Sequence, residues 1–214
     1  MTISAFGRIA VVALFSAFAA FLAVPKAHAQ SDAEAFTQHL IDQGVAILRD
    51  TSGGEGARRS KFSAFINQYA DARKAALFTL GAYRHGAAPA DIEAFVTAFH
   101  DYATAVYEAK LGIYKNQSLR VVGSIDNKPG DVTVNTVVDD GKSSGDPLRV
   151  AFRLLGSSGN YKFVDVQVEG IWLSIDQQEQ FASFLSKNGG SVPALTSYLV
   201  DKTQRINAGT EKVG

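Results

Sequence analysis

The sequence predicts an α+β domain built from helices, then an antiparallel sheet, then helices again. Apolar residues recur at helical spacing from residue 32 to about 111, and again from about 176 onward. Between residues 118 and 168 the period changes to two, which is typical of strands whose faces alternate. Segregation of helices and strands along the chain indicates the α+β class.

Residues 1–29 are predicted to be a cleaved secretory signal peptide. Arg8 gives a positively charged start, residues 9–24 form an uninterrupted apolar run, and Ala27-His28-Ala29 offers a cleavage site. A membrane anchor is the alternative, but 16 apolar residues are few for a bilayer span of about 20 residues. The expected organisation is a signal peptide over residues 1–29, one domain over residues 30–202 and a disordered tail over residues 203–214.

Charge and composition exclude several classes of function. Without Arg8 and Lys26, the 21 basic residues fall to 19 against 21 acidic ones, so the predicted mature chain carries a charge of −2. Because no basic block occurs, we do not expect nucleic acid as a partner. The absence of cysteine excludes a thiol nucleophile, a cysteine-ligated zinc and an iron–sulfur cluster. The fold must then be held by core burial, which 46% hydrophobic residues can supply.

Four helices are expected before the sheet. The first opens with a capping box at residues 31–34 and runs to Asp50, and residues 51–56 are expected to form a loop. The third ends near Gly81, and the fourth and longest covers residues 89–111. The apolar stripes that support the second and fourth helices are Phe62, Phe65, Ile66 and Tyr69, and then Ile92, Phe95, Val96, Phe99, Tyr102, Ala103 and Val106.

Four strands with short links are expected to form an antiparallel meander. Their predicted ranges are 118–125, 132–138, 148–155 and 161–168. The alternation from Lys162 to Val168 predicts one buried face, and we expect this strand to be the central strand of the sheet. A turn at Glu169-Gly170 leads to a second apolar segment that contains Trp172. Two closing helices are then expected, over about residues 176–188 and from Ser191.

No constellation of residues indicates catalysis. The predicted mature chain has three histidines, His39, His85 and His100, which lie on separate segments without the spacing of metal ligands. Neither a phosphate-binding P-loop nor the G-x-S-x-G elbow of hydrolases occurs. We therefore expect no enzymatic activity, no cofactor and no metal.

Asp165 has two possible environments. On an open sheet face it is an ordinary exposed carboxylate. Under a layer of helices it needs a partner such as Arg73, Arg84 or Arg153, because a buried unpaired charge is costly. A small hydrolase or isomerase built on Asp165 remains an alternative, although no second group stands at a suitable spacing.

Several segments together resemble one known family. They are residues 71–84 (DARKAALFTLGAYR), Phe95, Phe99 and Tyr102, then Tyr107 and Tyr114, residues 164–170 (VDVQVEG), and Gln180-Phe181. In this combination they resemble the MlaC family of periplasmic phospholipid-binding proteins, also called toluene-tolerance proteins. The resemblance covers about residues 35–200, and the D-V-x-V-E-G segment is its most specific part.

The resemblance implies both a fold and a role. The fold is a helical layer wrapped on a curved antiparallel sheet, similar to nuclear-transport-factor-like folds, with an apolar cavity for phospholipid acyl chains. The role is that of a soluble periplasmic carrier that ferries lipid between the outer and inner membranes, in the service of outer-membrane lipid asymmetry. The implied partners are an inner-membrane ABC transporter complex and an outer-membrane lipoprotein complex.

The chain departs from the family pattern at a few positions. The family commonly has Trp where Tyr161 stands, Ser where Trp172 stands and Arg where Gln178 stands. The Trp172-Leu173 pair and residues 188–190 look more like the branch associated with hopanoid synthesis. Two lipid classes, phospholipid and a hopanoid-associated lipid, therefore stay open as the cargo.

Bulky apolar side chains are the expected lipid ligands. The predicted set is Phe99, Tyr102, Val106, Val134, Val150, Phe152, Val166, Val168, Trp172, Phe181 and Leu185. The alternative is a fully packed core in a non-catalytic adaptor that binds proteins through its helices. Trp172 distinguishes the lipid carrier from the adaptor, because its side chain is expected to line the cavity of a carrier and to pack in the core of an adaptor. The basic residues expected to dock partners are Arg58, Arg59, Lys61 and Arg73.

Overall fold

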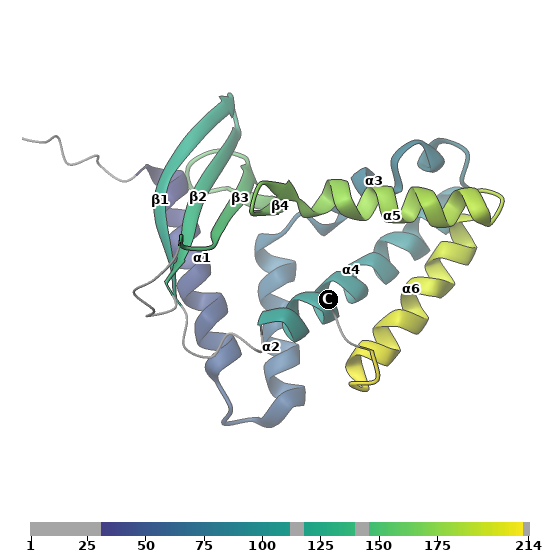
Figure 1. Ribbon diagram of the computed structural model, residues 1–214, viewed down its shortest axis with the longest axis horizontal. Coiled ribbons are helices and arrows are strands. Elements are labelled where there is room, and N and C mark those ends of the chain that lie inside the picture. Colours follow the sequence, from purple (N-terminus) through teal and green to yellow (C-terminus); the bar gives the residue numbers. More distant parts are fainter. Residues whose placement is uncertain (1–30, 112–117, 140–145, 212–214) are drawn as a thin grey trace, which may run out of the picture.

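Six α-helices, one short 3-10 helix and five strands make up the described part of the chain (Figure 1). The computed structural model describes residues 31–111, 118–139 and 146–211, so the predicted signal peptide lies outside it. The helices are α1 (Asp32–Arg49), α2 (Gly54–Tyr69), α3 (Ala72–Leu80), η1 (Gly81–His85), α4 (Pro89–Leu111), α5 (Leu173–Lys187) and α6 (Val192–Asn207). The strands are β1 (Ser118–Lys128), β2 (Asp131–Asp139), β3 (Arg149–Leu155), β4 (Lys162–Val168) and β5 (Ile171–Trp172). Among the described helices, none combines the length and the hydropathy needed to cross a membrane.

The sheet is an antiparallel meander in the order β1-β2-β3-β4-β5, which confirms the predicted α+β class and pairing. The predicted central position of β4 is wrong, because β3 occupies the middle of this order. The chain turns back at Glu169-Gly170, both with positive φ, and adds the two-residue strand β5, which the prediction of four strands did not include.

A bulge in β4 breaks the alternation that the sequence suggested. Phe163 pairs with Leu154 and Asp165 pairs with Arg153, so Val164 has no partner of its own on β3. The extra residue places Phe163 on the same sheet face as Val166, whereas strict alternation predicts opposite faces. The expectation of one buried face is also wrong, since every β4 residue except exposed Lys162 is half-buried.

Two separate hydrophobic cores lie within the described part of the chain. One lies between α1 and the sheet, at the left of Figure 1, and contains the buried residues Ala33, Val132, Val134 and Leu154. The other lies among α3, α4, α5 and α6 on the right, and five of its large side chains are at most 1% exposed. They are Leu80, Phe95, Leu185, Leu195 and Leu199.

Helix ends follow the predictions closely, with three exceptions. The capping box of Ser31 and Glu34 is present, and α4 has the predicted bounds. However, α2 begins inside the predicted loop 51–56, and α5 begins at Leu173 directly after β5. The disordered tail predicted from residue 203 is wrong for residues 203–211, because α6 continues to Asn207 and a hydrogen-bonded turn follows.

Candidate functional site

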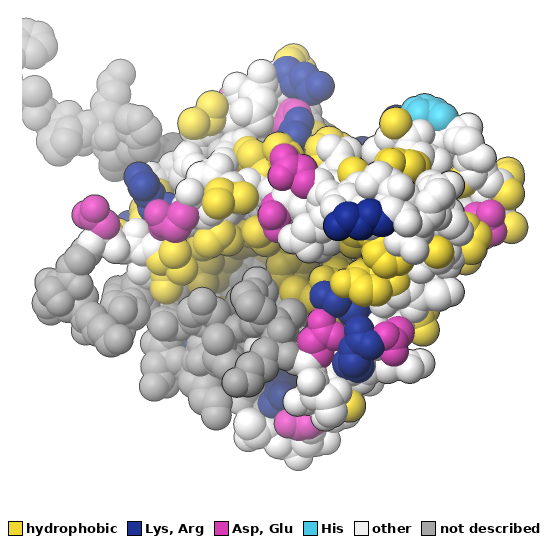
Figure 2. Space-filling view, turned by 45° about the vertical axis from the view of Figure 1, so that its right-hand side comes forward, with side chains coloured by type: hydrophobic (Ala, Val, Ile, Leu, Met, Phe, Trp, Pro, Cys, Tyr) yellow, Lys and Arg dark blue, Asp and Glu magenta, His cyan; other side chains and the backbone are white. Residues whose placement is uncertain are grey.

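A pocket of about 370 Å³ lies where the edge of β4 meets the helices. Its walls come from the α2–α3 junction, α4, β4, the start of α5 and the end of α6, so it joins segments far apart in the sequence. A volume of this size is at the lower end of the range for small-molecule sites. On the face drawn in Figure 2, hydrophobic side chains form a band across the described surface, with acidic and basic side chains beside it.

The pocket exists because β4 is incompletely paired on one side. β5 pairs only with Gln167 and Val168, so the earlier part of β4 faces helices instead of a strand. One bridge from Ala70 and one hydrogen bond, from the Asp71 N–H to the Phe163 carbonyl at 3.0 Å, fix the α2–α3 junction against this edge. All four residues 163–166 consequently line the pocket.

The inner wall of the pocket is mainly apolar. α4 contributes Phe99, Ala103 and Val106 on successive turns of one face. The opposite wall is formed by β4 and the α2–α3 junction, which supply Ile66, Ala70, Ala75, Phe163, Val164 and Val166. Such a surface gains free energy when an apolar ligand replaces water.

Asp165 faces this pocket rather than open solvent. Its carboxylate accepts hydrogen bonds from the Ser174 hydroxyl, from the Ser174 N–H at 3.1 Å and from its own neighbour's N–H, that of Val166, at 2.8 Å. Burial raises the pKa of Asp165 above its ordinary value, and these hydrogen bonds oppose that rise. Of the two environments considered for Asp165, the open sheet face is therefore wrong.

None of the three arginines proposed as partners of Asp165 bonds to it. Arg153 stands opposite it on β3 but donates to Asp131, from Nε at 3.0 Å and from Nη2 at 2.7 Å. Arg73 makes a two-pronged pair with Glu93, with both nitrogen–oxygen distances 2.7 Å. Ser174, which the sequence did not single out, takes the partner's place.

Two polar atoms on the pocket face of α4 have no hydrogen-bond partner. They are His100 Nε2 and Thr104 Oγ1, one turn apart along the helix. His100 Nδ1 lies 3.2 Å from the Asp101 carboxylate, which can only accept, so Nδ1 carries the hydrogen. One turn further, burial raises the pKa of Tyr107, which keeps its phenol neutral. These groups can bond to the polar part of a ligand.

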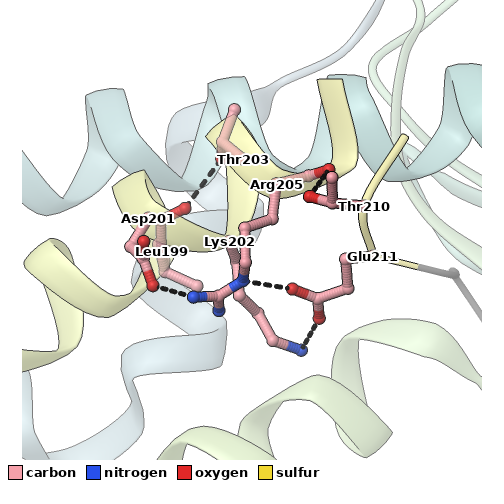
Figure 3. A network of polar contacts seen from close by, with 7 residues as sticks. All are labelled: Leu199, Asp201, Lys202, Thr203, Arg205, Thr210 and Glu211. Carbon is pink, nitrogen blue, oxygen red and sulfur yellow. Dashed lines mark hydrogen bonds and ion pairs between the residues drawn. The ribbon is translucent and has the colours of Figure 1, made fainter. Parts of the chain in front are cut away.

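Charged side chains meet at the end of the pocket formed by α6. Lys202 and Glu211 line it, and their Nζ and Oε1 atoms are 3.0 Å apart. Arg205 Nε approaches the other oxygen of Glu211 at 2.9 Å, so one carboxylate bridges two cations (Figure 3). This end of the pocket therefore differs in chemistry from its apolar interior.

Four of the eleven predicted lipid ligands line the pocket: Phe99, Tyr102, Val106 and Val166. Three others, Val134, Phe181 and Leu185, are buried in the two cores. Val150, Phe152, Val168 and Trp172 are half-buried and lie outside the lining. Contact of any of these residues with lipid stays a prediction. The sequence patterns did not predict that the edge of β4 and the end of α6 line a pocket, because the bulge in β4 has no sequence signal and the polar composition after Lys202 suggested a tail.

The four basic residues predicted to dock partners are all engaged with acidic ones. Arg59 Nε lies 3.1 Å from the buried Glu108, and Arg58 lies 4.0 Å from it. Lys61 pairs with Asp50 at 2.6 Å. Their role in docking stays a prediction. Within the described residues, no group of three or more His, Asp and Glu side chains is arranged to hold a metal ion.

Comparison with known proteins gives a match to a family model and similarity to solved structures. The family model described as "MlaC protein" matches residues 38–201. Among solved structures, the chain is similar to the phospholipid-binding protein from Ralstonia solanacearum, solved in complex with a phospholipid. The TM-score is 0.69 at 23% sequence identity, and the match covers 83% of this chain and 99% of that one. At this identity the likeness shows a shared fold.

Proposed function

The chain belongs to the MlaC family, and we propose that it is a lipid carrier that holds phospholipid acyl chains in the pocket between β4 and α4. The observation that carries this proposal is the pocket itself, with an apolar wall on either side and charged groups at one end. That pattern matches an amphipathic ligand better than a wholly polar or wholly apolar one. The solved relative of the same fold holds a phospholipid.

The energetics suit a carrier that exchanges lipid with membranes. Each methylene of an acyl chain gains about 0.8 kcal/mol on leaving water, so a chain of about 15 methylenes gains on the order of 12 kcal/mol. A lipid in a bilayer already has this gain, so the pocket can only match the membrane. Direction of transport then has to come from a partner, and the carrier itself needs no catalytic group.

The predicted signal peptide and the family support a periplasmic setting. The chain is exported to the periplasm, where it receives lipid from one membrane and delivers it to the other. An inner-membrane ABC transporter complex and an outer-membrane lipoprotein complex are the partners that supply direction. A pocket of this size argues against the alternative of a fully packed adaptor.

Lipid content of the exported protein tests the proposal. Native mass spectrometry and solvent extraction of the purified protein are expected to show bound phospholipid; a hopanoid-type lipid would redirect the cargo to that class. Val106→Trp places a large side chain in the pocket and is expected to abolish the bound lipid. Thr97→Trp, at an exposed position of the same helix, is the matched control. Native protein without lipid, or equal lipid in both variants, would contradict the proposal.

A further inference from the structure

The end of α6 brings two cations and one carboxylate together beside the pocket. We propose that Lys202 and Arg205 form a binding site for the phosphate group of the lipid, and that Glu211 occupies this site until the lipid arrives. The inference rests on the proposed function, because it supposes that acyl chains fill the pocket. Figure 3 shows both basic side chains reaching from α6 toward Glu211, which lies on the turn after the helix.

Local hydrogen bonds bring Glu211 back over the helix end. The N–H groups of Thr210 and Glu211 donate to the Arg205 carbonyl at 3.0 and 3.3 Å, and the Thr210 hydroxyl donates to it at 3.1 Å. Gly209 permits the reversal with a φ of +69°. The residues of this turn, 207–210, are all exposed. A short exposed turn opens at low free-energy cost, so Glu211 can leave without unfolding α6.

The two cations form a site of suitable chemistry for phosphate. Arg205 offers a planar set of N–H donors and Lys202 a compact charge, the two groups that bind phosphate most often in proteins. A phosphodiester carries one negative charge, as Glu211 does, so replacement conserves the charge of the site. Lys202 and Glu211 keep only 25% and 23% of their side-chain surface exposed, which limits screening by solvent.

The position of the site agrees with that of a headgroup. Lys202 and Ile206 line the pocket together with Tyr102, and the apolar side chains Phe99 and Val106 lie about one turn of α4 before and after Tyr102. Lys202 Nζ lies 5.4 Å from the centre of the Tyr198 ring, which helps to hold the ammonium group at this end. An acyl chain against α4 would therefore leave its phosphate beside Lys202. Asp201, which also pairs with Arg205, lies on the opposite side of that guanidinium (Figure 3).

Calorimetric titration of the delipidated full-length mature protein tests the inference. The ligands are a short-chain phosphatidylglycerol and the diacylglycerol with the same acyl chains, which lacks phosphate. The wild type is expected to prefer the phospholipid, and Lys202→Gln/Arg205→Gln to lose about tenfold in affinity for it while keeping its affinity for diacylglycerol. Arg120→Gln/Lys187→Gln removes the same charge from exposed positions and is expected to leave both affinities unchanged.

Glu211→Gln provides a second, independent measurement if the double variant folds poorly. Because it removes the competing carboxylate, it is expected to tighten phospholipid binding by up to about fivefold, with no effect on diacylglycerol. Unchanged or weaker phospholipid binding in this variant would overturn the inference.

Inorganic phosphate distinguishes a headgroup site from a site for free phosphate. Inorganic phosphate is expected to bind the wild type far more weakly than the phospholipid does. If phosphate instead binds the wild type as tightly as the phospholipid, and the double variant no longer binds phosphate, the site is one for free phosphate and the inference is wrong. If both lipids bind all variants alike, the headgroup site is wrong and the carrier proposal stands. If neither lipid binds the wild type, the carrier proposal itself fails.

Discussion

At the scale of single residues, Asp165 is a carboxylate whose charged form the fold disfavours. Its pKa is raised, first because the carboxyl is partly buried against the pocket. Three hydrogen bonds, two from Ser174 and one from the Val166 N–H, stabilise the charged form and reduce the shift. The balance between burial and these donors sets how folding depends on pH.

The contribution of Asp165 to stability is expected to fall as pH rises through the window above 3.8, the ordinary pKa of its carboxyl group. In this window the unfolded chain has released the proton while the folded protein still holds it, so each rise in pH favours unfolding. The loss is complete once pH exceeds the raised pKa. Asp165→Asn cannot titrate, so its stability should improve relative to wild type across the window. Urea unfolding from below pH 3.8 to neutral measures the difference.

Ser174→Ala serves as the companion variant for Asp165. It removes the hydroxyl donor, so it should raise the pKa of Asp165 further and extend the window to higher pH. Parallel pH profiles for the wild type and Asp165→Asn would show that Asp165 does not titrate abnormally.

Trp172 offers a second prediction at this scale. The side chain is half-buried, opposite Gln167 in the sheet, and outside the pocket lining. Fluorescence of this single Trp is therefore expected to stay the same when lipid is removed. The control is Tyr102→Trp in a Trp172→Phe background, whose emission should shift because residue 102 lines the pocket. A shift in the wild type would place lipid against Trp172.

At the scale of secondary-structure elements, what the sequence reveals depends on how local the signal is. The helix α4 was predictable because an apolar stripe repeats at helical spacing from Ile92 to Val106, over most of its length. The end of α6 was missed, although Leu195, Leu199 and Ile206 follow helical spacing and all are buried. The residues around Ile206 are mostly polar, so this one apolar residue did not suffice to predict that the helix continues.

The pocket was less predictable than the elements that form it. Its position depends on the bulge at Val164 and on the short β5, which follows the turn at Glu169-Gly170 and ends after two residues where α5 begins. Both features arise from pairing between strands and from packing against the helices, which period-two alternation does not encode. The predicted ligands on α4 and at Val166 line the pocket. The other predicted ligands, which were chosen because their side chains are bulky and apolar, lie in the cores or outside the pocket lining.

The start of α6 gives a prediction for one helix. Ser191 is its N-cap, and the hydroxyl oxygen accepts the Ala194 N–H at 3.2 Å. Ser191→Ala is expected to cost about 1 kcal/mol of stability, because that N–H loses its partner. Ser197→Ala, at an exposed position of the same helix, should change stability by less than about 0.5 kcal/mol. The midpoints of urea unfolding measure both changes in stability, provided that the dependence of the unfolding free energy on urea concentration is unchanged. Equal midpoints for Ser191→Ala and Ser197→Ala would exclude a capping role for Ser191.

At the scale of the whole molecule, the pocket lies between two cores, and polar links join the elements on either side of it. One core joins α1 to the sheet and the other joins α3 to α6. The links include the Arg59–Glu108 pair between α2 and α4, at 3.1 Å, and the hydrogen bonds of Ser174 with Asp165 between α5 and β4. A lipid that contacts both α4 and β4 adds apolar contacts between the two cores. The two cores should therefore unfold more cooperatively when lipid is bound.

Lipid removal is therefore expected to lower the melting temperature and to broaden the transition. A ligand at about 100 times its Kd adds about 2.7 kcal/mol. For a domain of about 180 residues this corresponds to a fall of about 5–10 °C on delipidation. Weaker coupling between the cores should also make the van't Hoff enthalpy smaller than the calorimetric one. Differential scanning calorimetry of lipid-loaded and delipidated protein measures both quantities.

The control is Val106→Trp, in which the indole occupies the pocket, so that delipidation should leave its unfolding transition unchanged. Wild-type transitions that coincide in position and shape would mean that lipid does not bridge the two cores.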